Sequence, residues 1–243
     1  MAESDDEQIT LSSHALAALQ EFYGERDAHV DKFEKLKAVA EDERVVVSQP
    51  LSMDAFTEDW NKSQFWYSDE TAILYAKQLL DGIREDEVVA VVSVPTVFIA
   101  LKNLLNAADA NAPKPKKVVF LEYDQRFSVF PEFIFYDFLH PIKLPAELKG
   151  GVDRIICDPP FLSEDCQTKM ALTIRWMSRS NPRLVITTGE RMEALVTKLY
   201  RSLGARTTTY EPVHTRGLSN EFYCYANFEC DAWKFKGGDN KGE

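Results

Sequence analysis

The sequence lacks the glycine motifs that mark several large enzyme classes. Its 243 residues include 10 glycines, and none of them falls into GxGxxG, GxxxxGK[ST] or GxSxG. The first absence argues against a typical dinucleotide site, and the second argues against a P-loop nucleotide site. The third argues against the nucleophile elbow of the α/β-hydrolases.

Cysteine and histidine are also sparse, with four of each. No two cysteines form a CxxC pair and the histidines are scattered, so no zinc pattern appears and no metal site is expected. Reduced structural thiols in the cytosol or nucleus are the plain interpretation of Cys157, Cys166, Cys224 and Cys230.

No long hydrophobic run is present. The longest, residues 88–101, is interrupted by Ser93, Pro95 and Thr96, and it is shorter than the roughly 20 residues that a membrane-spanning helix needs. The opening MAESDDEQ has neither the basic nor the apolar segment of a signal peptide. We therefore expect a cytoplasmic protein that does not associate with a membrane.

An excess of positive charge is missing as well. The 28 basic and 39 acidic residues give a net charge of −11, and residues 1–60, with 5 basic and 15 acidic residues, hold −10 of it. This balance argues against a nucleic-acid partner, because phosphate binding needs a basic surface. An acidic segment can instead attract a basic protein partner.

The composition that remains, with 45% hydrophobic and 28% charged residues, is ordinary for a globular protein. We expect residues 1–60 to form an acidic N-terminal helix, ending near Gly24, and a flexible linker. Residues 61–243 are expected to form the main domain, beginning with a helix that Ser68 caps and Gly82 ends.

Beyond Gly82, apolar runs alternate with helical patterns, which predicts an α/β fold with a mostly parallel sheet covered on both faces. Asp124 to Glu132 is too short for a full helical crossover and is expected to hold a single turn. The last two strands have no helix between them and predict an antiparallel edge. The expected strands are 88–94, 118–123, 133–138, 152–157, 184–188, 207–213 and 222–228. The expected helices are 97–108, 163–177, which Ser163 can cap, and 190–203.

Ligands of open α/β sheets bind at the carboxyl ends of the strands. The fourth expected strand ends in Asp158-Pro159-Pro160-Phe161. Two prolines cannot continue a sheet, so they fix a rigid turn and leave carbonyl groups free to accept hydrogen bonds. With a carboxylate and a flat apolar ring beside them, these acceptors suit an amine substrate. The alternative is a structural turn ahead of the next helix.

Three further groups of residues are candidates for the site because of where the predicted fold places them. Glu122 and Asp124 end the second strand, where an acid can bind the hydroxyls of a ribose, although a solvated loop acid is the common alternative. Trp66 and Tyr67 belong to a run of three aromatics that could line a pocket or stabilise a cation, or could simply pack. The polar loop 214–221, with His214 and Asn220, lies on the rim of the sheet unless it is an ordinary hairpin loop.

Together these residues resemble the class I S-adenosylmethionine-dependent methyltransferases, in which a (D/N)PP(Y/F) tetrapeptide serves amine and amide nitrogens. The segments SSHALAALQEFY, QFWYS, EYDQRF, EFIFYDF, DPPFLSE and HTRGLSNEF are similar, in this order, to the elongation factor 1-alpha lysine methyltransferase 1 family. Members of that family were earlier labelled N6-adenine DNA methyltransferases.

The resemblance implies a Rossmann-like fold with seven strands, S-adenosylmethionine as methyl donor, and translation elongation factor 1-alpha as the protein substrate. Ser93-Val94-Pro95-Thr96 stands where the superfamily has a glycine-rich loop. The expected cofactor-binding residues are Ser93, Pro95, Thr96, Glu122, Asp124, Asp137 and Phe138. The expected catalytic residues are Asp158, Pro159, Pro160 and Phe161, with Trp66, Tyr67, His214 and Asn220 on the substrate side. The alternatives are an N6-adenine nucleic-acid methyltransferase and a non-catalytic scaffold.

Overall fold

The computed structural model describes residues 50–56, 58, 64–217 and 221–237, together with the isolated positions 17, 24, 28, 31 and 34. Most of the expected N-terminal helix and linker, and Asn220, lie outside these residues. No helix in the described part is long and apolar enough to cross a membrane.

Seven strands form one sheet in the order β3-β2-β1-β4-β5-β7-β6. The first five strands in the chain run parallel and β7 is antiparallel to its neighbours, so the expected fold class is confirmed. The strands are β1 Val88–Val92, β2 Lys117–Glu122, β3 Phe133–Phe135, β4 Val152–Cys157, β5 Ser178–Gly189, β6 Arg206–Thr207 and β7 Phe222–Ala226.

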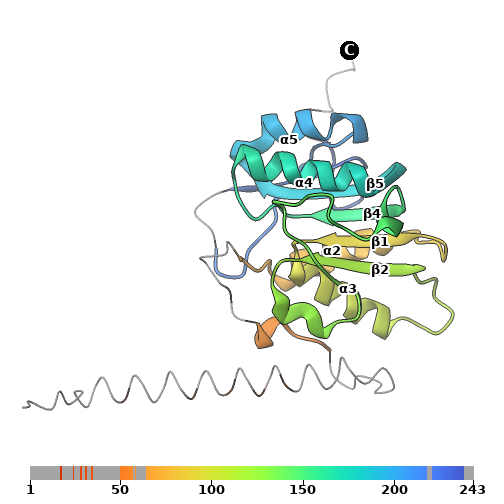
Figure 1. Cartoon of the computed structure of the whole chain (residues 1–243), viewed down its shortest axis with the longest axis vertical. Helices are drawn as coiled ribbons and strands as arrows, with labels where there is room; N and C mark the ends of the chain where they lie inside the picture. The colour runs from red at the N-terminus through yellow and green to blue at the C-terminus, as the bar shows by residue number, and fades with distance from the viewer. Residues whose placement is uncertain are drawn as a thin grey trace, which may run out of the picture.

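Helices cover both faces of this sheet (Figure 1). Strand residues alternate between two buried clusters: Val89 and Val91 of β1 pack with α2 and α3, whereas Ala90 and Val92 pack with α4 and α5. This alternation is what a parallel strand buried on both faces requires. The helices are α2 Asp69–Leu80, α3 Pro95–Ala107, α4 Glu164–Met177 and α5 Glu193–Leu199.

Serine caps begin two of these helices at the predicted positions. The Ser68 side chain accepts a hydrogen bond from the Thr71 N–H at the start of α2, and the Ser163 side chain accepts one from the Cys166 N–H at the start of α4. A short 3-10 helix, η3 (Gln125–Val129), occupies the connection that is too short for a crossover helix. Both predictions are confirmed.

Some predicted boundaries are wrong. The first strand stops at Val92, because Ser93 takes a left-handed conformation (φ 55°) and turns the chain into α3 at Pro95. The third strand stops at Phe135. The expected strand 207–213 is replaced by the two-residue strand β6, Arg206–Thr207. Val213 lies away from the sheet edge and bonds with Thr71 and Ser68 at the start of α2.

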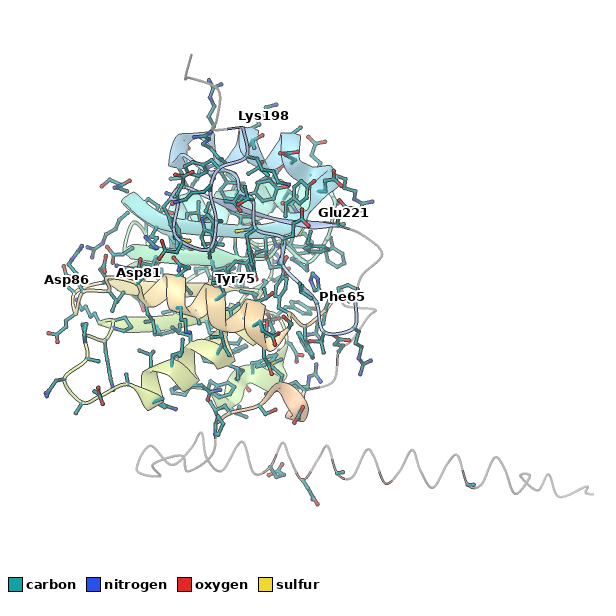
Figure 2. All side chains as sticks on the ribbon, turned by 180° about the vertical axis from the view of Figure 1, so that it is seen from behind. Phe65, Tyr75, Asp81, Asp86, Lys198 and Glu221 are labelled. Atoms are coloured by element: carbon teal, nitrogen blue, oxygen red, sulfur yellow. The ribbon has the colours of Figure 1, made fainter. Side chains whose placement is uncertain are left out.

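The expected helix 190–203 is divided into η5 (Glu190–Met192), α5 and η6 (Arg201–Leu203), because Met192 and Tyr200 both depart from helical geometry. β5 is longer than expected at its amino end and extends to Gly189. Figure 2 shows Phe65 and Glu221 at one edge of the molecule and Asp81 and Asp86 at the opposite edge. The parallel strands end at the edge that carries Phe65 and Glu221.

Candidate active site

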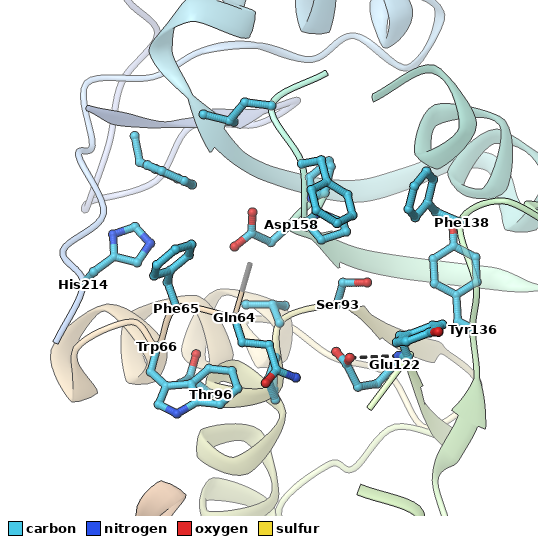
Figure 3. A pocket seen from close by; sticks show the side chains of 18 of the residues that line it. Gln64, Phe65, Trp66, Ser93, Thr96, Glu122, Tyr136, Phe138, Asp158 and His214 are labelled. Carbon is cyan, nitrogen blue, oxygen red and sulfur yellow. Dashed lines mark hydrogen bonds between the residues drawn. The ribbon is translucent and has the colours of Figure 1, made fainter. Parts of the chain in front are cut away.

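A cavity of about 860 Å³ opens at the carboxyl ends of β1, β2 and β4. Asp158 lies near its middle, with Phe65 and His214 on one side and Ser93 and Glu122 on the other (Figure 3). The lining includes twelve of the expected site residues: Trp66, Ser93, Pro95, Thr96, Glu122, Asp137, Phe138, Asp158, Pro159, Pro160, Phe161 and His214.

Ser93 shapes the floor between β1 and α3. It is the only non-glycine residue with positive φ in the described part of the chain, and its N–H donates to Leu121 O at 2.8 Å. Serine therefore adopts the conformation that glycine takes most easily. α3 then begins at Pro95 with no side chain capping its first turn. A helix start of this kind favours an anionic group.

Glu122 ends β2 inside the cavity and is buried. Its Oε1 accepts the N–H groups of Tyr123 and Asp124 at 2.8 and 3.0 Å. Burial raises the pKa of Glu122 to about 7, although these two N–H groups oppose the rise. Since both N–H groups bond to Oε1, Oε2 is available to the hydroxyl groups of a bound ligand.

Asp124 takes a different role from Glu122. Its carboxylate receives Arg126 Nη2 at 2.6 Å and Gln64 Nε2 at 2.9 Å, and it does not line the cavity. Asp124 also caps η3 through the Arg126 N–H. The structure therefore does not bring Asp124 into the site, and its carboxylate fastens the segment at Gln64 to the loop after β2.

The cavity wall beyond β3 is formed by Tyr136, Asp137 and Phe138. The Tyr136 hydroxyl lies 2.8 Å from Thr173 Oγ1 on α4. The Asp137 carboxylate accepts the Leu139 N–H at 2.9 Å and lies 3.0 Å from His140 Nδ1. These contacts hold the aromatic rings of Tyr136 and Phe138 in the cavity wall, and such rings suit a purine.

Asp158 follows β4 directly, and its N–H donates to Val92 O. The Tyr67 hydroxyl donates to Asp158 Oδ2 at 2.7 Å and lies 2.8 Å from Thr187 Oγ1. Burial raises the pKa of Asp158 to about 8; the Tyr67 hydrogen bond opposes the rise and the Glu122 carboxylate adds to it. Tyr67 does not line the cavity, so it contacts the site through Asp158.

Phe161 is 40% exposed and its ring centroid lies 5.7 Å from that of Phe138. The other side of the cavity is aromatic. The His214 ring lies 4.4 Å from the Tyr67 ring and 4.6 Å from the Phe222 ring. Burial lowers the pKa of His214 to about 4, so the imidazole is neutral at pH 7 and acts as part of this wall.

Several residues of the site have no counterpart in the sequence-based prediction. Phe222, Leu162 and Arg191 line the cavity, and Thr187 contacts Tyr67. Thr187 is the next-to-last residue of the predicted strand 184–188, so the rule applied to the ends of the first four strands could have identified it. In the described residues, no group of three or more His, Cys, Asp or Glu side chains could hold a metal ion.

The cavity fits S-adenosylmethionine on three counts. Glu122 Oε2 can accept hydrogen bonds from a ribose, the uncapped start of α3 suits a carboxylate, and the wall at Phe138 suits adenine. Burial raises the pKa of both Glu122 and Asp158 because it disfavours their charged forms. A bound cation offsets that cost by favouring the ionised carboxylates, so a cation is favoured there. The sulfonium and ammonium groups of this cofactor are such cations.

Comparison with known proteins agrees with this assignment. A family model described as "Probable N6-adenine methyltransferase" matches residues 58–230. Among solved structures, the branched-chain polyamine synthase of Thermus thermophilus has a TM-score of 0.50 at 13% identity, over 74% of this chain and 63% of its own. At that identity the likeness shows the fold alone.

Similarity to curated proteins extends over nearly the whole chain. Protein-lysine N-methyltransferase EFM5 of Saccharomyces cerevisiae is 41% identical, over 93% of this chain and 94% of its own. EEF1A lysine methyltransferase 1 of Homo sapiens is 37% identical, over 93% and 94%. The Gallus gallus protein of the same name is 39% identical, over 94% and 98%. The chain therefore belongs to the methyltransferase family that includes EFM5 and EEF1A lysine methyltransferase 1.

Proposed function

We propose that this protein methylates a lysine of translation elongation factor 1A, with S-adenosylmethionine as the methyl donor. The observation that carries the proposal is the Asp158–Phe161 turn facing an aromatic wall inside the cavity at the end of β4. Relatives that match almost the full length of the chain support it, since they are named EEF1A lysine methyltransferase 1 or, in one case, protein-lysine N-methyltransferase EFM5.

Within the cavity, Glu122, Ser93 and the start of α3 would hold the cofactor. When bound, S-adenosylmethionine supplies an electrophilic methyl group on its sulfonium. Asp158 and the Pro159 carbonyl accept N–H bonds from the lysine amine and so direct its lone pair. Positioning of this kind contributes more here than a strong base, because the amine is itself the nucleophile.

The lysine must lose a proton before it can attack. Burial between Phe161, Trp66 and Phe222 disfavours the ammonium form and lowers its pKa from about 10.4. The carboxyl groups of Asp158 and Glu122, whose pKa values burial raises to about 8 and 7, ionise more readily once the ammonium group enters and then attract it. The aromatic rings stabilise it as well. These walls also exclude water from the amine once the proton has left.

The runner-up is N6-adenine methylation, which the description of the family model favours. A neutral adenine gains less than an ammonium group from two neighbouring carboxylates. Residues 61–243 hold 23 basic and 24 acidic residues, so the charge of this part gives little support to phosphate binding. A lysine acceptor is therefore the better match to the cavity.

Further proposals concern the whole chain. We infer that residues 61–243 form the methyltransferase domain and that residues 1–60 are an acidic extension. We also propose a cytoplasmic location, which an acceptor that serves translation supports. No observation in the cavity calls for a nucleic acid, a membrane or a metal ion.

The test compares wild type with Asp158→Ala and with Asp165→Ala, an exposed acid on α4. Each protein receives labelled cofactor with purified elongation factor 1A, DNA or RNA. We expect label in the elongation factor for wild type and Asp165→Ala, and none for Asp158→Ala, with all three equally folded by circular dichroism. Full activity of Asp158→Ala, or label in nucleic acid alone, would sink the proposal.

A further inference from the structure

The end of β5 lies beside the turn that carries the proposed chemistry. Ile186 of β5 pairs with Cys157 of β4, so the next residue of each strand is Thr187 and Asp158. Thr187 and Thr188 are both fully buried. Because strand side chains alternate, two consecutive threonines reach opposite faces of the sheet.

On the α2 face, Thr187 acts through Tyr67. The Tyr67 hydroxyl lies 2.8 Å from Thr187 Oγ1 and 2.7 Å from Asp158 Oδ2. Tyr67 is only 2% exposed, and its ring is packed against His214. The phenol therefore has little freedom, and it holds the carboxylate at the first residue of the turn.

On the α4 face, Thr188 acts through Gln167. Gln167 Nε2 lies 2.9 Å from Thr188 Oγ1 and 3.3 Å from the carbonyl oxygen of Phe161. Gln167 is fully buried. This contact holds Phe161, the last residue of the turn. The next residue, Leu162, packs closely on Gly189 of β5: a Cβ added at Gly189 would lie 2.9 Å from the Leu162 side chain.

The turn needs such contacts because its own backbone provides few. Pro159 and Pro160 have no N–H to donate. Asp158 makes the last bond to β1, through Val92 O, and the sheet does not continue beyond it. Side chains must therefore supply the hydrogen bonds that hold the turn, because the backbone bonds between strands stop at Asp158.

We propose that Thr187 and Thr188 are positioning residues that fix the two ends of the Asp158–Phe161 turn, through Tyr67 on one face and Gln167 on the other. The consequence for methylation rests on the proposed function. The consequence for the geometry of the turn does not rest on the proposed function. The experiment therefore measures methylation and turn geometry separately.

The first measurement is kinetic. Thr187→Val and Thr188→Val keep the branched shape but lose the hydroxyl, and we expect kcat to fall about 10- to 100-fold, as small misplacements of reacting groups do. The KM for the cofactor should stay within about twofold. Thr187→Ser and Thr188→Ser should restore most of kcat. Thr208→Val is the matched control: Thr208 is equally buried, but its hydroxyl bonds to Cys224 O.

The second measurement is amide hydrogen exchange, which needs no acceptor. We expect faster exchange at Asp158 and at residues 161–163 in both valine variants of the pair, and unchanged exchange there in Thr208→Val. Unchanged protection, or full kcat in both valine variants, overturns the positioning role. A turn that loosens in a protein that does not methylate the elongation factor supports positioning and refutes the proposed function.

Discussion

At the scale of single residues, the site places groups in states that cost stability. Ser93 occupies a left-handed conformation at the end of β1, and Glu122 and Asp158 bury carboxyl groups with no cationic side chain bonded to them among the described residues. Backbone strain and buried ionisable groups with shifted pKa values gather where a ligand is to be bound. Each can be tested by a single substitution.

The conformation of Ser93 predicts the order of stability among its variants. Ser93→Gly should leave the free energy of unfolding unchanged or raise it, because glycine adopts positive φ without a steric penalty. Ser93→Val should lower it by about 1–2 kcal/mol, since a side chain in this region clashes with the backbone. Urea denaturation measures both variants. A valine variant as stable as the glycine variant would contradict the left-handed assignment.

The buried Glu122 predicts a dependence of stability on pH. Its pKa rises from 4.5 to about 7 on folding, so the unfolded chain releases this proton first. Stability therefore falls as pH rises between about 4.5 and 7, and the loss is complete above pH 7.

Glu122→Gln removes this penalty while keeping an acceptor for the N–H groups of Tyr123 and Asp124. At pH 8 it should be more stable than wild type by roughly 1–3 kcal/mol, because one pKa unit is worth about 1.4 kcal/mol. The difference should vanish by about pH 4, and cofactor binding should weaken at every pH. Denaturation at several pH values measures the difference in the free energy of unfolding between the two proteins. A difference that does not depend on pH would refute the raised pKa of Glu122.

At the scale of elements, Arg154 on β4 fixes the end of α2 far from the cavity. Its guanidinium donates to the carbonyls of Leu79, Asp81 and Gly82, at 3.1, 2.5 and 2.7 Å, and lies 2.9 Å from Glu87 Oε2. The carbonyls of Leu79 and Asp81 are among those that the end of a helix leaves unpaired, and Gly82 follows the C-cap. The arrangement holds the orientation of α2, whose first turn begins at Ser68, next to Tyr67.

Arg154→Met should therefore lower the free energy of unfolding by about 3 kcal/mol, because it leaves a buried carboxylate short of its main partner. Arg84→Met is the control: Arg84 also contacts Glu87 but is 64% exposed, and its loss should lower the free energy of unfolding far less than the loss of Arg154. Thermal and urea denaturation compare the two variants. Equal losses would show that burial of the Arg154 pair does not matter.

At the scale of the whole molecule, charge is distributed unevenly along the chain. Residues 1–60 carry a net charge of −10 and residues 61–243 carry −1. A charged extension on a near-neutral body affects association with a partner more than it affects the fold. We expect it to attract basic surfaces of the protein substrate.

The test replaces the acids between Asp27 and Asp59 by their amides and leaves Glu58 intact, because its Oε1 holds the Trp66 N–H. The KM for the elongation factor should rise and depend less on salt, while the KM for the cofactor stays constant. The control neutralises as many exposed acids within residues 61–243. An unchanged, salt-insensitive KM would show that the segment does not help to bind the substrate.

The sequence by itself determined the alternation of strands and helices, the serine caps at Ser68 and Ser163, and the rigid Asp158–Phe161 turn. These follow from local physics: the period of the apolar residues, the hydrogen-bonding groups near a helix start, and the missing N–H of proline. Because parallel strands end at one edge of a sheet, the sequence also placed most of the site residues together.

Only the tertiary structure decided which side chains meet there. Glu122 and Asp124 are two positions apart, yet one faces the cavity and the other bonds Arg126 and Gln64. Tyr67 reaches Asp158 across 91 positions and Thr187 across 120. Contacts over such separations, and the pKa shifts that burial causes, depend on how the packed chain surrounds each group, which no local pattern contains.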